Sequence, residues 1–216
     1  MNSVRTARPD DVPRIVAIHR QAFPGFFLTS LGDRFLSRFY QAMTRAPDAI
    51  CLVAERGAGI DGFIVGPLHP AGYFRRLFLS RGLAFAFDAI PALIKRPGAV
   101  GARLLRAVRY RGEAPVMWPD AALVSSVAVA PDAVGSGAAG ALIEGFCAQA
   151  AARGAGHVYL TTDIVDNPAA NRFYRKHSFE VESVLVRPDG RMMNRYLRRL
   201  GDAEAADGRA RGGCNE

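Results

Sequence analysis

The sequence has few of the features that define secreted, membrane-spanning or metal-binding proteins. Its three cysteines lie far apart and show no metal-ligand spacing: Cys51, Cys147 and Cys214. We therefore expect reduced thiols, no disulfide framework and no bound metal. The first residues include no apolar stretch of the signal-peptide kind, and the longest nearly apolar run, 82–94, is too short to span a bilayer. These absences favour a cytoplasmic protein without a transmembrane segment.

The composition is that of one folded domain. The chain has 216 residues, of which 50% are apolar, and this is enough to bury a single sizeable core. We expect one domain over residues 1–200, as a monomer or a homodimer. Residues 201–216 are polar and rich in glycine and alanine, which predicts a disordered tail.

Positive charge is concentrated in one segment. Between positions 70 and 111, eight arginines and one lysine face a single acid, Asp88, so this stretch carries the whole formal charge of +8. Such a segment indicates either an anionic partner or a solvated helical face. We favour a helical, basic insertion at 69–117 that caps the core with its arginines toward water, and peripheral membrane contact stays open. Nucleic acid is not expected, because the stacking aromatics of known modules are missing.

The remaining pattern alternates strands and amphipathic helices. We predict strands at 4–7, 50–55, 62–65, 122–129, 157–162, 180–187 and 192–197. We predict helices that begin at Asp10 or Asp11, that span 32–44 and 167–177, and that continue from the turn at 135–140 to Arg153. Apolar residues at helical spacing and glycine or proline at the boundaries support these assignments.

A glycine-rich turn links the strand at 122–129 to the following helix. Residues 135–140 read G-S-G-A-A-G and match the dinucleotide fingerprint G-x-G-x-x-G, with Asp163 at the end of the next strand. Against a dinucleotide fold, five residues including Pro131 separate the strand from the first glycine, and the unit begins past the middle of the chain. Under either interpretation, amides at a helix start can bind a diphosphate.

Two segments resemble the GNAT superfamily of N-acetyltransferases. Residues 127–143 resemble its acetyl-CoA signature, a strand and a proline followed by Arg/Gln-x-x-Gly-x-Gly/Ala. Gly137 and Ala139 fit the two small positions, and Val134 stands where Arg or Gln is usual. Residues 167–179, N-P-A-A-N-R-F-Y-R-K-H-S-F, are similar to the family's Asn-x-x-Ala-x-x-Leu/Phe-Tyr-x-x-x-Gly-Phe segment, with Ser178 in place of glycine. The resemblance covers roughly 2–68 and 119–199.

The resemblance implies a fold and a donor. The expected fold is α/β (α+β), with a mixed, mainly antiparallel central sheet flanked by helices and a helical insertion between the third and fourth strands. The implied co-substrate is acetyl-CoA, and the implied reaction is transfer of its acetyl group to an amine. Residues placed on the coenzyme are Val127, Ala128, Val129, Val134, Gly135, Ser136, Gly137, Ala138, Ala139, Asn167 and Asn171.

The resemblance also implies catalytic roles. Tyr174 is the expected general acid for the departing thiolate, since a phenol of ordinary pKa ~10 keeps its proton at neutral pH. The family's usual strand carboxylate is replaced by Thr161 and Thr162, which leaves Asp163 as the candidate base. The expected acceptor is a small-molecule amine, which the arginines suggest is anionic, such as an amino sugar nucleotide. Protein N-terminal or lysine acetylation, and acyl-CoA binding without turnover, stay open as alternatives.

Overall fold

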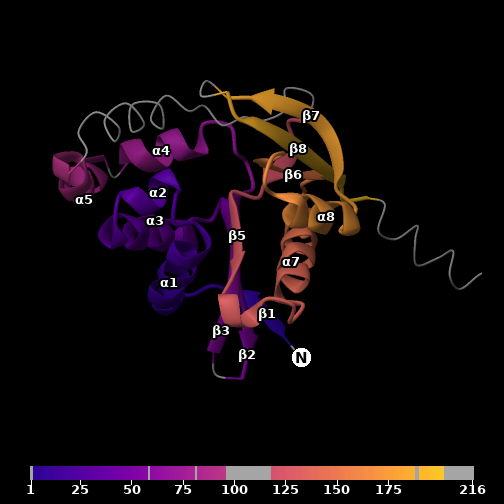
Figure 1. The fold of residues 1–216 in the computed structure, drawn as a ribbon, viewed down its shortest axis with the longest axis horizontal. Helices are drawn as coiled ribbons and strands as arrows, with labels where there is room; N and C mark the ends of the chain where they lie inside the picture. Colours follow the sequence, from indigo (N-terminus) through magenta and orange to yellow (C-terminus); the bar gives the residue numbers. More distant parts are fainter. Residues whose placement is uncertain (1, 58, 81, 96–117, 188–189, 202–216) are drawn as a thin grey trace, which may run out of the picture.

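The structure, a computed structural model, describes residues 2–57, 59–80, 82–95, 118–187 and 190–201 (Figure 1). The strands are β1 (Ser3–Thr6), β2 (Ala49–Arg56), β3 (Gly59–Pro67), β4 (Ala121–Leu123), β5 (Ser126–Val129), β6 (His157–Asp163), β7 (Glu180–Val186) and β8 (Met192–Arg199). The helices are α1 (Val12–Ala22), α2 (Phe27–Ser30), α3 (Asp33–Arg45), α4 (Tyr73–Ser80), α5 (Gly82–Lys95), α7 (Ala138–Ala152) and α8 (Pro168–Lys176), with 3₁₀ turns η1 (Pro9–Asp11) and η2 (Pro131–Ala133).

The strands form two four-stranded sheets, ordered β1-β2-β3-β5 and β4-β6-β8-β7. All pairs are antiparallel except β4 with β6. The expected mixed, mainly antiparallel architecture with flanking helices is therefore confirmed. Two core clusters fill the layers: one packs α1 and α3 against one face of the first sheet, and the other lies under α7 and joins the two sheets. Figure 1 shows that the two sheets, with the helices that cover them, diverge from the region of β5 and α7.

The single strand predicted over 122–129 is wrong in one respect, because it divides between the two sheets. β4 pairs with β6, and β5 pairs with β3. The division occurs at a bulge: Val65 is the register partner of Ser126, yet its carbonyl also accepts the N–H of Ser125 at 2.9 Å. Two residues therefore oppose one, which bends the strand. Its two halves are turned toward different neighbours.

A glycine on β3 allows this bend. A Cβ on Gly66 would lie only 1.7 Å from the carbonyl oxygen of Leu123 and 3.1 Å from the amide nitrogen of Ser125. Real Cβ atoms do not approach backbone so closely, so only glycine fits here. The point where the two sheets separate therefore depends on one missing side chain.

The expected helical insertion is present between β3 and β4. Its described part consists of α4 and α5, and α5 lies against α3 (Figure 1). The remainder of the predicted insertion, 96–117, and the predicted tail from 202 onward lie outside the described residues. Cys51 and Cys147 are free and buried.

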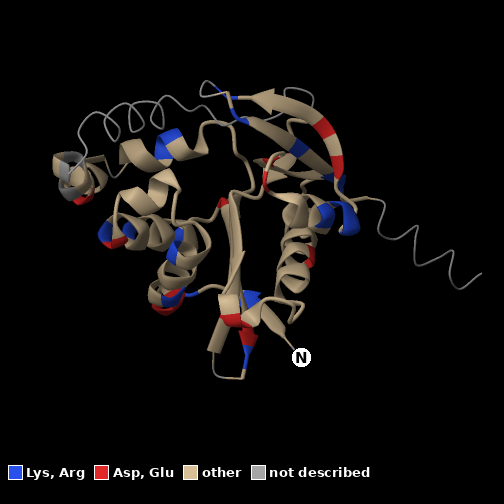
Figure 2. Ribbon diagram, in the orientation of Figure 1, with Lys and Arg blue, Asp and Glu red and all other residues tan. Residues whose placement is uncertain are grey.

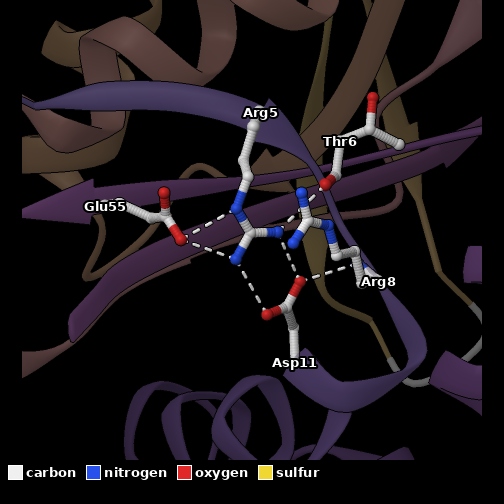
Figure 3. Close-up of polar contacts among 5 residues, drawn as sticks. All are labelled: Arg5, Thr6, Arg8, Asp11 and Glu55. Atoms are coloured by element: carbon white, nitrogen blue, oxygen red, sulfur yellow. Dashed lines mark hydrogen bonds and ion pairs between the residues drawn. The ribbon is translucent and has the colours of Figure 1, made fainter. Parts of the chain in front are cut away.

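An ion-pair cluster joins β1, β2 and the start of α1 (Figure 3). The guanidinium of Arg5 donates to both oxygens of Asp11, at 2.6 and 2.9 Å, and to Glu55 at 2.8 Å. Asp11 also accepts the backbone N–H of Arg8 at 2.6 Å. The hydrogen bonds from Arg5 hold the pKa of Asp11 below its usual value, although burial acts in the opposite direction.

Replacing Asp11 by asparagine should lower the free energy of unfolding by about 2 kcal/mol at pH 7, because the buried side chain of residue 11 loses its charge-assisted hydrogen bonds and Arg5 keeps only Glu55 as an anionic partner. The pKa of Asp11 is lower in the folded than in the unfolded chain. Its stabilising contribution is therefore complete above about pH 4 and is lost as the pH falls through the lowered pKa. Urea unfolding of both proteins at a series of pH values should show the difference shrinking toward acid.

Asp33→Asn is the matched control for this change. The Arg20–Asp33 pair, 2.9 Å apart, is more than half exposed on both sides. Exposed pairs of this kind contribute at most about 1 kcal/mol. An Asp11→Asn variant as stable at pH 7 as Asp33→Asn would contradict the role given to the cluster.

Candidate active site

The site is built around the edges that β5 and β6 turn toward each other. On β5, the N–H of Ala130 donates to Asp61 at 2.7 Å, and the register pairs Ala128 with Phe63. In an antiparallel ladder alternate residues face the partner strand, so the peptide groups of Val127 and Val129 face away from β3. The peptide group of Ala128 pairs with β3, so it does not lie on the free edge.

On β6, the edge that faces β5 also has peptide groups that point away from the neighbouring strand β8. The N–H of Val124 donates to the carbonyl of Tyr159 at 2.9 Å, where β4 ends. Further along β6, the N–H of Ile164 donates to Met192 of the β8 side at 3.1 Å. By the same alternation, the peptide groups of Thr161 and Asp163 face the side of β5. Two strand edges thus diverge. Among the described residues, the peptide groups of Val127, Val129 and Thr161 make no backbone hydrogen bond across the gap, whereas the carbonyl of Asp163 accepts the side-chain amide of Asn171.

The glycine-rich turn lies at the end of β5. Gly135 and Gly137 have φ values of 85° and 84°, a left-handed conformation that favours glycine. Ser136 precedes Gly137, the N-cap residue of α7, and its hydroxyl accepts the N–H of Ala138, the first residue of the helix, at 3.3 Å. Within the described ranges, the amides of Gly137 and Ala139 have no acceptor. The turn therefore presents free N–H donors at the positive end of a 15-residue helix.

Val134 precedes this turn and is exposed, so no side chain there provides a positive charge. Among the described residues, the backbone amides of the turn and the dipole of α7 are then the groups that could hold an anion at this end of the site.

Tyr174 lies on α8 with its side chain inside the second core cluster. Its ring packs among Phe173, Phe179 and Tyr196, with centroids 5.3 to 6.0 Å apart. Its hydroxyl has no hydrogen-bond partner among the described residues. Burial raises the pKa of Tyr174 to about 12. The phenol is thus protonated at neutral pH and available to a group that enters the site.

Asn171 and Asn167 hold α8 against the end of β6. The side-chain amide of Asn171 donates to the carbonyls of Asp163 and Asn167, at 2.9 and 2.7 Å. Its oxygen accepts from Asn194 and Tyr196, both at 2.9 Å. The side chain is therefore fully engaged within the protein. Asn167 donates to the hydroxyl of Thr162 at 2.7 Å.

Asp163 is held in an ion pair. Arg191 donates to its two oxygens at 3.1 and 3.2 Å, and both side chains are partly exposed. The carboxylate therefore lies at the end of the free edge of β6, with a cation already beside it.

One feature was not found from the sequence: a buried chain of polar side chains beneath the bulge. The hydroxyl of Tyr40 lies 2.7 Å from Nδ1 of His19, and Ser126 of β5 is hydrogen-bonded to the same hydroxyl. Burial lowers the pKa of His19 to about 4 and raises that of Tyr40. Both groups are therefore neutral at pH 7. In the sequence, this chain could have been found from His19, a polar residue on the apolar face of the helix that became α1.

No group of three or more His, Cys, Asp or Glu side chains in the described ranges could hold a metal ion. In the same ranges, no helix is long and apolar enough to cross a membrane.

Comparison with known proteins agrees with this geometry. Residues 92–179 match the model of the Acetyltransferase (GNAT) family, a range that includes the glycine-rich turn and α8. The fold is also similar to solved N-acetyltransferases. One is the ribosomal-protein-S18-alanine N-acetyltransferase from Escherichia coli (14% identity, 93% of this chain and 94% of that one, TM-score 0.55). Another is an N-acetyltransferase from Staphylococcus aureus Mu50 (17% identity, 93% and 99%, TM-score 0.59). No curated protein matches the chain.

Residues 92–179 thus match the GNAT acetyltransferase family, whose members use acetyl-CoA as co-substrate, and the fold of the chain is similar to that of solved N-acetyltransferases. The resemblance seen in the two sequence segments is thereby confirmed.

Proposed function

We propose that this protein transfers the acetyl group of acetyl-CoA to the amine of a small molecule. The observation that carries the proposal is the continuity between the free edges of β5 and β6 and the amide-rich turn at 135–139. The pyrophosphate would bind to the amides at 135–139. The pantetheine arm would then extend along the peptide groups of Val127 and Val129, as an added strand does.

The reaction needs a group that polarises the thioester carbonyl, an acid for the thiolate and a base for the amine. The amine nitrogen attacks the thioester carbonyl carbon, the carbon–sulfur bond breaks, and the thiolate takes a proton. A backbone N–H on the free edge of β5 would polarise the carbonyl. Tyr174 would protonate the thiolate, and Asp163 would receive the proton of the amine directly or through water. Asn171 would position α8, and with it Tyr174, rather than contact the coenzyme. Asn167 would hydrogen-bond the pantetheine.

The acceptor is proposed from charge. The excess of arginine at 70–111 would suit an amine that also carries phosphate or carboxylate, such as an amino sugar nucleotide. Solved neighbours of this fold have names that differ widely in acceptor, from a ribosomal protein to an aminoglycoside. Release of free thiol should be measured with acetyl-CoA and a panel of amino sugar nucleotides, aminoglycosides, N-terminal peptides and lysine peptides. Turnover with peptides alone would overturn the small-molecule assignment, and no turnover with any amine would favour a non-catalytic acyl-CoA-binding protein.

A charge placed in the glycine-rich turn should weaken coenzyme binding without weakening the fold. The hydroxyl of Ser136 accepts the first N–H of α7, and a carboxylate near a helix N-terminus is favoured by the helix dipole. In Ser136→Asp the new carboxylate would repel the pyrophosphate, and a unit charge ~4 Å away is enough for at least a tenfold loss of affinity. Calorimetric titration with acetyl-CoA should show this loss, while the melting temperature stays close to that of the parent.

Ser136→Asn is the neutral counterpart, because its side-chain oxygen can also accept a backbone N–H but adds no charge. It should bind acetyl-CoA within about threefold of the parent. Equal binding by the Asp and Asn variants would place the pyrophosphate away from this turn.

A further inference from the structure

The outer side of α5 is apolar although it faces solvent. Its inner side packs on α3: Phe85 and Ala89 are buried, and Asp88 forms an ion pair with Arg38. On the other side, large apolar side chains are exposed, up to 93% for Leu83 and 75% for Ile94. We call this surface the α4–α5 apolar face, and it consists of Leu79, Leu83, Phe87, Ile90 and Ile94.

The spacing shows that the α5 part of this surface is one continuous face. Leu83, Phe87, Ile90 and Ile94 are separated by three or four residues, which places them on one side of consecutive turns of α5, and Leu79 lies near the end of α4. A surface helix normally presents polar residues outward. The only charged residues within α5 are Asp88, which is turned to the core, and Lys95 at its end. The face is therefore built to be covered by something apolar.

The charge around the face decides what covers it. Arg75 and Arg76 are exposed on α4, directly before the apolar residues, and Figure 2 shows basic residues on that helix. The stretch from 70 to 111 carries +8. A second copy of this surface would bring like charges together, whereas an anionic lipid surface attracts them. With 14 residues, about 21 Å long, α5 is too short to span a bilayer but long enough to lie along one.

We propose that the α4–α5 apolar face docks on anionic membranes. Leu83, Phe87 and Ile94 enter the boundary between headgroups and acyl chains, and the arginines contact the phosphates. This inference does not depend on the acetyl acceptor. The sequence favoured an insertion that caps the core with its arginines toward water and left peripheral membrane contact open. The inner side of α5 does cap the core, and the proposal assigns its outer side to the lipid.

The test is co-sedimentation of the full-length protein with vesicles of phosphatidylcholine alone or mixed with phosphatidylglycerol. Binding is expected to the mixed vesicles only, and to weaken as salt is raised. The double variant Leu83→Ser/Phe87→Ser should lower the partition coefficient at least about tenfold, because two apolar side chains no longer enter the bilayer. Both residues are largely exposed, so the melting temperature should stay the same.

Val181→Ser/Val184→Ser is the matched control. These valines are also exposed, on β7, but Glu180 and Glu182 are beside them. This variant should bind the mixed vesicles as the parent does. Equal binding of the parent to both kinds of vesicle, or unchanged binding of the Leu83/Phe87 variant, would overturn the proposal. So would a dimer seen by light scattering that the Leu83/Phe87 variant abolishes, in a protein that does not bind vesicles.

Discussion

Tyr174→Phe should lower kcat for acetyl transfer by about 100- to 10,000-fold, the range over which general acids contribute. The phenol has no hydrogen-bond partner among the described residues, so its removal leaves no unsatisfied group in the core. The pKa of Tyr174, raised to about 12 by burial, means that the hydroxyl keeps its proton across the working range. The KM for acetyl-CoA should change far less than kcat, because the proton is needed only when the thiolate leaves.

The measurement is steady-state thiol release at saturating acetyl-CoA, with titration of acetyl-CoA binding alongside. Tyr73→Phe is the control: Tyr73 is also buried, its pKa is also raised to about 12, and among the described residues its hydroxyl hydrogen-bonds only to the sulfur of Met43. It should retain the kcat of the parent. If Tyr174→Phe also retains it, Tyr174 only lines the site and the thiolate leaves without its help.

Gly66→Ala should have the largest effect on folding. The added methyl group would lie 1.7 Å from the carbonyl oxygen of Leu123, so backbone must move where β4 and β5 separate. We expect a loss of at least about 3 kcal/mol, since neither strand can yield without breaking its pairing. For a domain of this size, that loss corresponds to a melting temperature lower by about 6–12 °C.

Affinity for acetyl-CoA should fall together with stability in this variant, because the same bend sets the distance between β5 and β6. Differential scanning calorimetry and coenzyme titration provide the two readouts. Gly82→Ala is the control, since a Cβ there meets nothing within 4 Å. A Gly66→Ala protein with the parent's melting temperature would show that the bulge does not depend on this glycine.

The sequence predicted most elements because their signals are local. Helical spacing of apolar residues placed α1 and α3, and the strand pattern placed β2, β3 and β6 within a few residues of their observed bounds. The glycine-rich turn at 135–140 was visible because left-handed backbone needs glycine, and the structure has Gly135 and Gly137 in that conformation. The roles given to the site residues remain predictions.

The division of 122–129 between two sheets could not be predicted in the same way. The apolar run is continuous, and the bulge at Ser125 is defined by Val65, which is 60 residues away in the chain. Gly62 and Gly66 on β3 were a usable signal, because glycine inside a strand often marks a close backbone approach. The engagement of Asn171 with four partners on α8, β6 and β8 was likewise invisible.

By itself, the sequence determined the succession of helices and strands, the glycine-rich turn before α7 and the concentration of positive charge at 70–111. These follow from each residue's own backbone freedom, polarity and charge. Only the tertiary structure decided which strand edges are left without partners, which polar side chains are already engaged, and which side of α5 faces water. Those properties depend on contacts between distant segments, and no local pattern contains them.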